Sequence, residues 1–159
     1  MEKKKTVLML LLLAIMLLTA CVANVPDAPE TPKTALPAIT DPYTPEHAKQ
    51  NGDVVNLHGQ VTNQERWEQF MDQVHAKQQD QVRVTIYTIE GDPIIYELNY
   101  DGTAIQYSYD NTRDAYAGKG RIVNNACQGI GTMKAEQGGE FYILTGCENE
   151  DYAFMLPKL

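Results

Sequence analysis

The first hydrophobic segment of the chain is continuous and short. Residues 7–18 are all apolar, and three lysines at positions 3–5 precede them. A helix that spans a membrane needs about 20 apolar residues, whereas the apolar part of an export signal has about 7–15 and follows positive charge. This pattern therefore predicts a signal peptide over residues 1–20.

The next segment has few large apolar residues. Residues 21–50 contain six of the eight prolines, separated mainly by Ala, Thr, Asp and Glu. Such a composition buries too little surface to offset the entropy lost on ordering. We expect a disordered, Pro-rich linker over residues 21–50 and a single folded domain over residues 51–159.

Helical periodicity appears near the start of this domain. Four apolar residues recur at i, i+3, i+4 and i+7: Trp67, Phe70, Met71 and Val74. This spacing is typical of one face of an amphipathic helix. Thr62 and Glu65 have the spacing of a capping box, so we expect the helix to start after Thr62 and to run to about Gln78.

From Val82 onward the period changes to two, which is typical of β-strands. The pattern predicts a three-strand antiparallel meander, with a turn at residues 90–93 and a hairpin at Asp101-Gly102, where glycine supplies a positive φ. Residues 110–121 lack periodicity and are expected to form a loop. Four further strands are predicted at residues 122–127, 130–134, 140–147 and 152–156. The predicted fold is α+β, with one main amphipathic helix packed on an antiparallel β-meander sheet.

The three cysteines have different surroundings. Leu18-Thr19-Ala20-Cys21 resembles the bacterial lipobox, which implies cleavage before Cys21 and attachment of lipid to its sulfur. An ordinary secretory signal with a chance cysteine is the alternative. Cys127 and Cys147 then remain as an even pair in an oxidising compartment, and we expect one disulfide to close the domain. A redox or metal-binding thiol pair is the alternative, but no Cys-x-x-Cys is present.

The charge of the chain argues against two classes of partner. Loss of residues 1–20 removes three lysines and one glutamate, which takes the net charge from −8 to −10. An acidic domain is repelled by phosphate backbones and by anionic lipid headgroups. We therefore expect no nucleic-acid partner, and membrane contact through the lipid anchor alone.

Several short strings in the domain resemble one known family. They are Asn51-Gly52-Asp53-Val54-Val55, His58-Gly59, Tyr87-Thr88 with Glu90-Gly91-Asp92-Pro93-Ile94, Tyr100-Asp101-Gly102, Tyr109-Asp110-Asn111 and Gly146-Cys147. In order and spacing, over about residues 51–147, they resemble a family of lipoproteins from bacilli catalogued as a domain of unknown function, number 4362. The resemblance implies a Gram-positive surface lipoprotein, and it transfers no catalytic residue.

Residues that carry chemistry are sparse. Ser108 is the only serine and lacks a Gly-x-Ser-x-Gly elbow. The histidines lack metal-ligand spacing, and residues 110–115 depart from a calcium loop at its third and sixth positions. We therefore expect no catalytic residue, no metal site and no cofactor.

Two residues are candidates for binding. His58, in a loop expected beside a helix start, is a candidate for binding an anion. Tyr87 has the opposite side-chain parity to Val84 and Ile86, so it is a candidate for an exposed binding face. Four other tyrosines share parity with Ile94, Leu98 and Ile105 and are expected in the core: Tyr96, Tyr100, Tyr107 and Tyr109.

The hypothesis that follows is a monomeric, non-enzymatic binding or interaction module, held by lipid on the extracytoplasmic face of the cell membrane. Its expected partner is a cell-envelope protein, peptide or glycan. One alternative is a small cell-envelope hydrolase, or an inhibitor of one, that uses carboxylates not identifiable from sequence. Another is a purely structural envelope component. An enzyme should show a concave pocket with convergent acidic or histidine side chains.

Overall fold

The computed structural model describes residues 35–149 and 154–158, all of them within one unit, Thr34–Leu159. The predicted signal peptide, Cys21 and residues 22–34 of the predicted linker lie outside the described residues. Within the described part of the chain, no helix has the length and apolar character needed to cross a membrane.

The largest element is a six-stranded sheet, whose strands lie in the order β2-β1-β3-β4-β5-β6. Its strands are β1 (Val54–Leu57), β2 (Gln60–Thr62), β3 (Asp80–Tyr87), β4 (Pro93–Tyr100), β5 (Ile105–Asp110) and β6 (Ile122–Cys127). The strands β3 to β6 are antiparallel neighbours, whereas β1 runs parallel to β3. The predicted α+β class is confirmed, but the sheet is mixed rather than purely antiparallel.

The helix α3 (Gln64–Ala76) connects β2 to β3 and packs on the sheet through its predicted apolar stripe. Trp67 and Phe70 are fully buried, and Met71 and Val74 pack against the same core. The predicted capping box is wrong. Thr62 is the last residue of β2, so the helix is capped instead by Asn63, in the left-handed conformation at φ 54° and without a side-chain capping bond.

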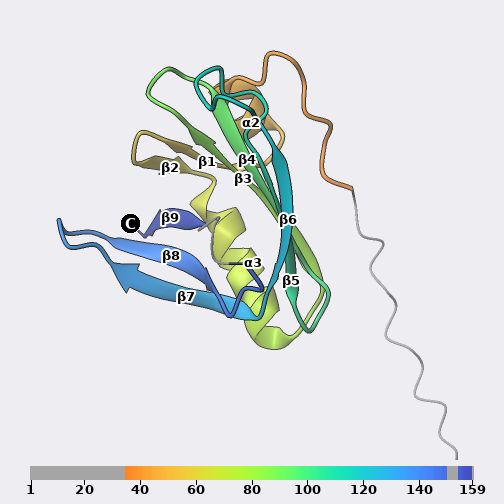
Figure 1. Ribbon diagram of the computed structural model, residues 1–159. Coiled ribbons are helices and arrows are strands. Elements are labelled where there is room, and N and C mark those ends of the chain that lie inside the picture. Colours follow the sequence, from red (N-terminus) through yellow and green to blue (C-terminus); the bar gives the residue numbers. More distant parts are fainter. Residues whose placement is uncertain (1–34, 150–153, 159) are drawn as a thin grey trace, which may run out of the picture. The chain divides into compact units, whose positions relative to one another are not determined.

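A second, three-stranded sheet packs beside α3 (Figure 1). It consists of β7 (Gly129–Lys134), β8 (Glu140–Thr145) and β9 (Met155–Lys158), in that order. The sequence predicted these strands but not a separate sheet, and β9 begins later than the strand expected at residues 152–156. Tyr142 and Phe154 stack near Trp67, with ring centroids 5.6 and 5.4 Å away. The main core therefore lies between the two sheets and α3.

The disulfide expected between Cys127 and Cys147 is present. Cys127 ends β6 of the large sheet, and Cys147 follows β8 of the small sheet. The cysteine count predicted this bond, and the structure shows that it joins the two sheets covalently.

Residues 35–50, which we call the strap, fold onto the other face of the large sheet. Thr44 caps the short helix α2 (Pro45–Gln50). Tyr43 and Ala48 are buried in a second apolar cluster with Val55, Tyr87 and Ile95. The prediction of a disordered linker is therefore wrong for residues 35–50. The few apolar residues of this segment are ordered because they pack on apolar side chains of the large sheet.

Candidate functional site

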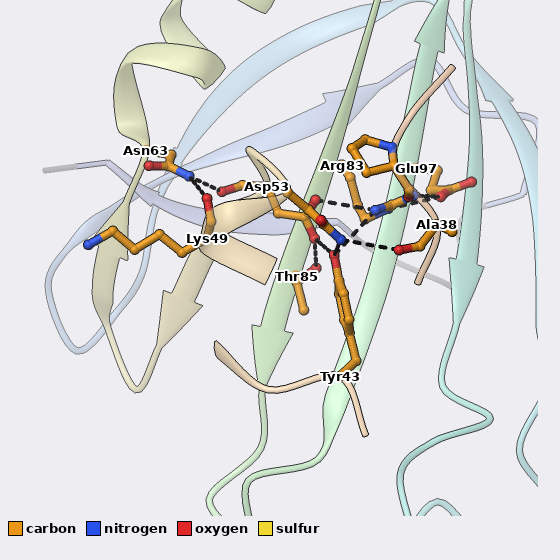
Figure 2. Close-up of polar contacts among 10 residues, drawn as sticks. Ala38, Tyr43, Lys49, Asp53, Asn63, Arg83, Thr85 and Glu97 are labelled. Carbon is orange, nitrogen blue, oxygen red and sulfur yellow. Dashed lines mark hydrogen bonds and ion pairs between the residues drawn. The ribbon is translucent and has the colours of Figure 1, made fainter. Parts of the chain in front are cut away.

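The most concentrated group of polar side chains lies beneath the strap (Figure 2). Asp53, just before β1, is fully buried and accepts hydrogen bonds at Oδ2 from the hydroxyls of Tyr43 and Thr85, each 2.7 Å away. Arg83 of β3 is also buried, and its Nη1 lies 3.4 Å from Asp53 Oδ1. Side chains of the strap and of β3 therefore meet at one carboxylate.

The same group holds the backbone of the strap. Arg83 Nη2 donates to the carbonyl of Pro37 at 2.8 Å and to Glu97 Oε1 at 2.8 Å. Asn51 Nδ2 donates to the carbonyl of Ala38, and the Tyr87 hydroxyl donates to the carbonyl of Tyr43 at 3.0 Å. Asn63 Nδ2 donates to a fourth carbonyl of the strap, that of Lys49, at 3.1 Å.

Burial and mutual interactions shift the pKa values of the residues in this group. Burial raises the pKa of Asp53, and the hydrogen bonds from Tyr43 and Thr85 offset this only in part. Burial alone would lower the pKa of Arg83, but attraction to Asp53 and the hydrogen bond to Glu97 raise it. Burial also raises the pKa of Tyr43. Such matched, desolvated partners stabilise one arrangement of the chain.

The polar atoms of this buried group are paired with one another and with the strap. Among the described residues, the only buried side-chain nitrogen or oxygen without a hydrogen-bond partner is Trp67 Nε1, on the other face of the sheet. The oxygens of Asp53 and the nitrogens of Arg83 are therefore engaged by the protein itself. No group of three His, Cys, Asp or Glu side chains within residues 35–149 and 154–158 is placed to bind a metal ion.

The structure corrects both predicted binding residues. Tyr87 lies on the face that the strap covers and is buried, so the prediction of an exposed binding residue is wrong. His58 is exposed, but it lies in the turn between β1 and β2, where its Nε2 donates to the Thr88 carbonyl at 2.8 Å. The strand β2 lies between this turn and α3, so His58 does not directly precede the helix as expected, and anion binding by His58 stays a prediction.

One hollow gathers acidic side chains, as a hydrolase would require. It is lined by Glu97, Ser108, Asp110 and three isoleucines and has a volume of about 140 Å³. Glu97 is paired with Arg83, and Asp110 with Arg113 at 3.0 Å. Ligand pockets measure roughly 300–1,000 Å³, so this hollow is small, and each carboxylate already has an arginine partner.

Two loops and the first residue of β6 expose large apolar side chains at one end of the large sheet. These loops are residues 88–92 and 111–121, at the top of Figure 1. Together with the turn at residues 58–59 and the first residue of β6, we call them the loop end. Ile89 is 89% exposed, Tyr116 is 77% exposed and Ile122 is 61% exposed. Among the described residues, these are three of the four exposed large hydrophobic side chains.

Hydrogen bonds brace these loops against each other. His58 is bonded to the Thr88 carbonyl, as described above, and Asp92 Oδ2 accepts from the Ala115 amide at 2.9 Å. Asp114 Oδ1 accepts from the Tyr116 amide at 2.8 Å, within the third loop. A surface that is already ordered loses less entropy on binding than a flexible one.

The opposite end of the sheet is polar. Its two turns expose five residues without a large apolar side chain among them: Lys77, Gln78, Gln79, Asp101 and Thr103. Exposed apolar side chains gathered at one end mark an interaction surface, whereas single scattered ones need no explanation. The sequence offered a weak signal, since Ile89 is apolar within a predicted turn and Tyr116 is aromatic within a loop without periodicity.

The comparisons with known proteins give one match. A family model described as Domain of unknown function (DUF4362) matches residues 51–142, which is more than half of the chain. The matched region includes β1 to β7 and α3, whereas the strap and β9 lie outside it. No curated protein and no solved structure matches the chain.

Proposed function

The chain belongs to the family described as Domain of unknown function (DUF4362), and from this premise we propose that it is a lipid-anchored, non-enzymatic binding module on the extracytoplasmic face of a bacterial membrane. The continuous apolar run over residues 7–18 and the cysteine at position 21 support the anchor. Two acyl chains would hold the protein durably, whereas one gives marginal attachment.

The proposed binding surface is the loop end, and the observation that carries it is the exposure of Ile89 and Tyr116 on braced loops. A protein partner fits this surface better than a lipid bilayer does. Glu90, exposed beside Ile89, and the net charge of −10 expected for the exported chain both oppose contact with anionic headgroups. Tyrosine is among the side chains that most often contribute strongly to protein interfaces.

The anchor is tested by Cys21→Ser, expressed with its export signal intact. The expected result is uncleaved precursor, or release of the domain into the medium, measured by fractionation and by the mass of the protein. A Cys21→Ser protein that stays on the membrane at the mature size would refute lipid attachment at this cysteine.

The binding surface is tested by site-specific photo-crosslinking in cells. A photoreactive residue at Tyr116 is expected to give a discrete crosslinked species, and the same residue at Gln79, on the polar end, is expected to give none. The species should disappear when Ile89→Asp is added, while Gln78→Asp leaves it unchanged. Equal crosslinking from both ends, or insensitivity to Ile89→Asp, would contradict a partner at the loop end.

A further inference from the structure

The strap reaches the bases of both loops that carry exposed apolar side chains at the loop end. At the first loop, the hydroxyl of Tyr87 donates to the Tyr43 carbonyl of the strap at 3.0 Å. Tyr87 is the last residue of β3, and the loop at residues 88–92 follows it directly. A backbone carbonyl of the strap therefore holds the residue from which the loop of Ile89 starts.

The second loop begins and ends beside the strap. Ile39 of the strap lines one hollow together with Asp110 and Ile122. Asp110 ends β5 and Ile122 begins β6, so these two residues are the immediate neighbours of the loop at residues 111–121. They are also opposite each other in the sheet. Movement of Ile39 away from the sheet would therefore open the base of the loop that carries Tyr116.

The two loops are joined to each other as well as to the strap. The Ala115 amide of the second loop donates to Asp92 Oδ2 of the first loop at 2.9 Å. This bond is exposed to water, and such a bond contributes only modestly to stability on its own. The order of the loops therefore depends also on whether their bases, at Tyr87 and at Asp110, stay fixed.

The strap is also attached at a point away from the loop end (Figure 2). The hydroxyl of Tyr43 donates to Asp53 and accepts from Asn51 and Arg83, each of these two at 3.2 Å. Asp53 directly precedes β1, whereas the turn that belongs to the loop end follows this strand. A change at the Tyr43 hydroxyl can therefore loosen the strap without touching either loop.

We propose that attachment of the strap controls binding at the loop end. The attached strap holds both loops in the arrangement that presents Ile89 and Tyr116, and its release loosens the loops and weakens the partner. This inference rests on the proposed partner at the loop end. Coupling of this kind is reciprocal, so a bound partner also stabilises the attached strap. The strap lies nearer in sequence to Cys21 than β1 does, so displacement of the proposed lipid anchor acts on the strap first.

Hydrogen exchange of four backbone amides tests the coupling in the full chain without any partner. The amides of Ala48, Thr88 and Asn111 report the strap, the first loop and the second loop, because each donates to a carbonyl within its own segment. The Asp101 amide, which donates to the Ala104 carbonyl, reports the polar end of the sheet.

Tyr43→Phe is expected to raise exchange at the strap amide and at both loop amides by at least about fivefold, while the Asp101 amide stays within about twofold. Tyr100→Phe is the matched control, because the hydroxyl of Tyr100 donates to the Gly102 carbonyl at 2.9 Å, at the polar end. This control is expected to leave the strap and both loops within about twofold. Unchanged loop amides in Tyr43→Phe, an equal rise at all four amides, or an equal effect of the two variants overturns the coupling.

The unaltered chain supplies a second measurement that does not depend on the folding of Tyr43→Phe. At urea concentrations below the unfolding transition, the amides of Ala48, Thr88 and Asn111 are expected to open with one common dependence on urea, as members of one cooperative unit do. Different urea dependences of the strap amide and the loop amides would show that these segments open separately, and would overturn the coupling.

Photo-crosslinking in cells, with the photoreactive residue at Tyr116, tests the effect on the partner. Tyr43→Phe is expected to lower the yield of the crosslinked species by at least about fivefold at equal protein level, and Tyr100→Phe to leave it within about twofold. An unchanged yield in Tyr43→Phe overturns control by the strap and leaves the partner itself in place. Absence of any crosslinked species from the unaltered chain contradicts the proposed function instead, and amide exchange then still decides whether the strap and the loops are coupled.

Discussion

The hydroxyl of Tyr43 donates a 2.7 Å hydrogen bond to Oδ2 of Asp53, and this contact joins the strap to the residue that directly precedes β1 of the large sheet. Both residues are buried, and the accepting carboxylate also bonds Thr85 and lies beside Arg83. The position of the strap therefore depends on a polar contact that water cannot replace without reaching the interior. This dependence makes the attachment of the strap measurable.

Tyr43→Phe removes the hydroxyl and keeps the ring in its apolar cluster. We expect the free energy of unfolding to fall by about 1–3 kcal/mol, because a buried carboxylate loses one of its donors. Urea unfolding gives this value, and hydrogen exchange of residues 35–50 is expected to rise. Tyr116→Phe is the matched control, since Tyr116 is exposed and should change stability by less than about 0.5 kcal/mol. Equal effects of the two changes would show that the hydroxyl of Tyr43 is not a structural contact.

Asn63→Asp tests the joint between the strap and α3. Asn63 Nδ2 donates to the carbonyl of Asp53 at 2.8 Å and to that of Lys49 at 3.1 Å. Aspartate tolerates the left-handed backbone but cannot donate, so we expect a loss of about 1–3 kcal/mol. The favourable interaction of the new carboxylate with the helix dipole offsets only about 0.3–1 kcal/mol of this loss. Thermal unfolding should show the deficit relative to Asn124→Asp, an exposed position on β6; an unchanged melting temperature would argue against the two bonds.

Replacement of Cys127 and Cys147 by alanine removes the bond between the two sheets. The closed loop spans 20 residues, so the chain-entropy model predicts a loss of about 3 kcal/mol in the free energy of unfolding. We also expect earlier hydrogen exchange in β7 to β9 than in β3 to β5, because the small sheet would keep only its noncovalent contacts. Uniform exchange across both sheets in the double variant would show that the disulfide does not hold the small sheet on the core.

Asp101 is expected to make the free energy of unfolding rise with pH in the acid range. Backbone hydrogen bonds from Ala104, together with bonds from Thr103, lower the pKa of Asp101 from its usual 3.8 to about 2. Between these values the unfolded chain binds a proton that the folded chain does not, so stability contributed by Asp101 rises with pH. We therefore expect Asp101→Asn to be less stable than the unaltered chain above about pH 4, and the difference to vanish as the pH falls through about 2.

Urea unfolding between pH 2 and pH 6 measures this difference, with Asp72→Asn, on the exposed face of α3, as the control for loss of one charge. Asp53 acts in the opposite sense, because burial raises its pKa and its contribution to stability is lost as the pH rises above its usual value. It is present in both proteins and cancels in the comparison. A difference between the proteins that stays constant across this range would contradict the low pKa of Asp101.

The elements that periodicity predicts well are those whose partners are close in sequence. The apolar stripe of α3 is buried as expected through Trp67 and Phe70, and the strands β3, β4 and β5 pair in order. Side-chain parity also identified the core tyrosines: Tyr96, Tyr100 and Tyr107 are buried, and Tyr109 packs against the same cluster. The disulfide was predictable because only two cysteines remained once Cys21 was assigned to lipid.

The arrangement of distant segments was not predictable in the same way. The parity of Tyr87 correctly placed it on the face opposite Val84, but parity says nothing about what covers that face. The strap covers this face. Its proline-rich composition predicted disorder, although Tyr43 and Ala48 pack on the sheet. Likewise, nothing local distinguishes β7 and β8 from further strands of the large sheet, because separation into two sheets depends on how the main core is filled.

The candidate binding surface was missed for a related reason. Titratable character singled out His58, and strand parity singled out Tyr87. Ile89 and Tyr116 belong to two loops that are 27 positions apart, and only the strand order brings these loops to the same end of the sheet. Exposure of an apolar residue is a property of the folded chain, so single residues in loops could not be ranked from the sequence.

The position of the strap also defines where a recombinant form of this domain should begin. The family match starts at Asn51, and a protein begun there would lack Tyr43 and Ala48. Val55, Tyr87 and Ile95 would then face water, and the carboxylate of Asp53 would lose its phenolic partner. Such a fragment would expose an apolar sheet face and tend to aggregate, whereas a protein begun at residue 35 retains the strap that buries this face.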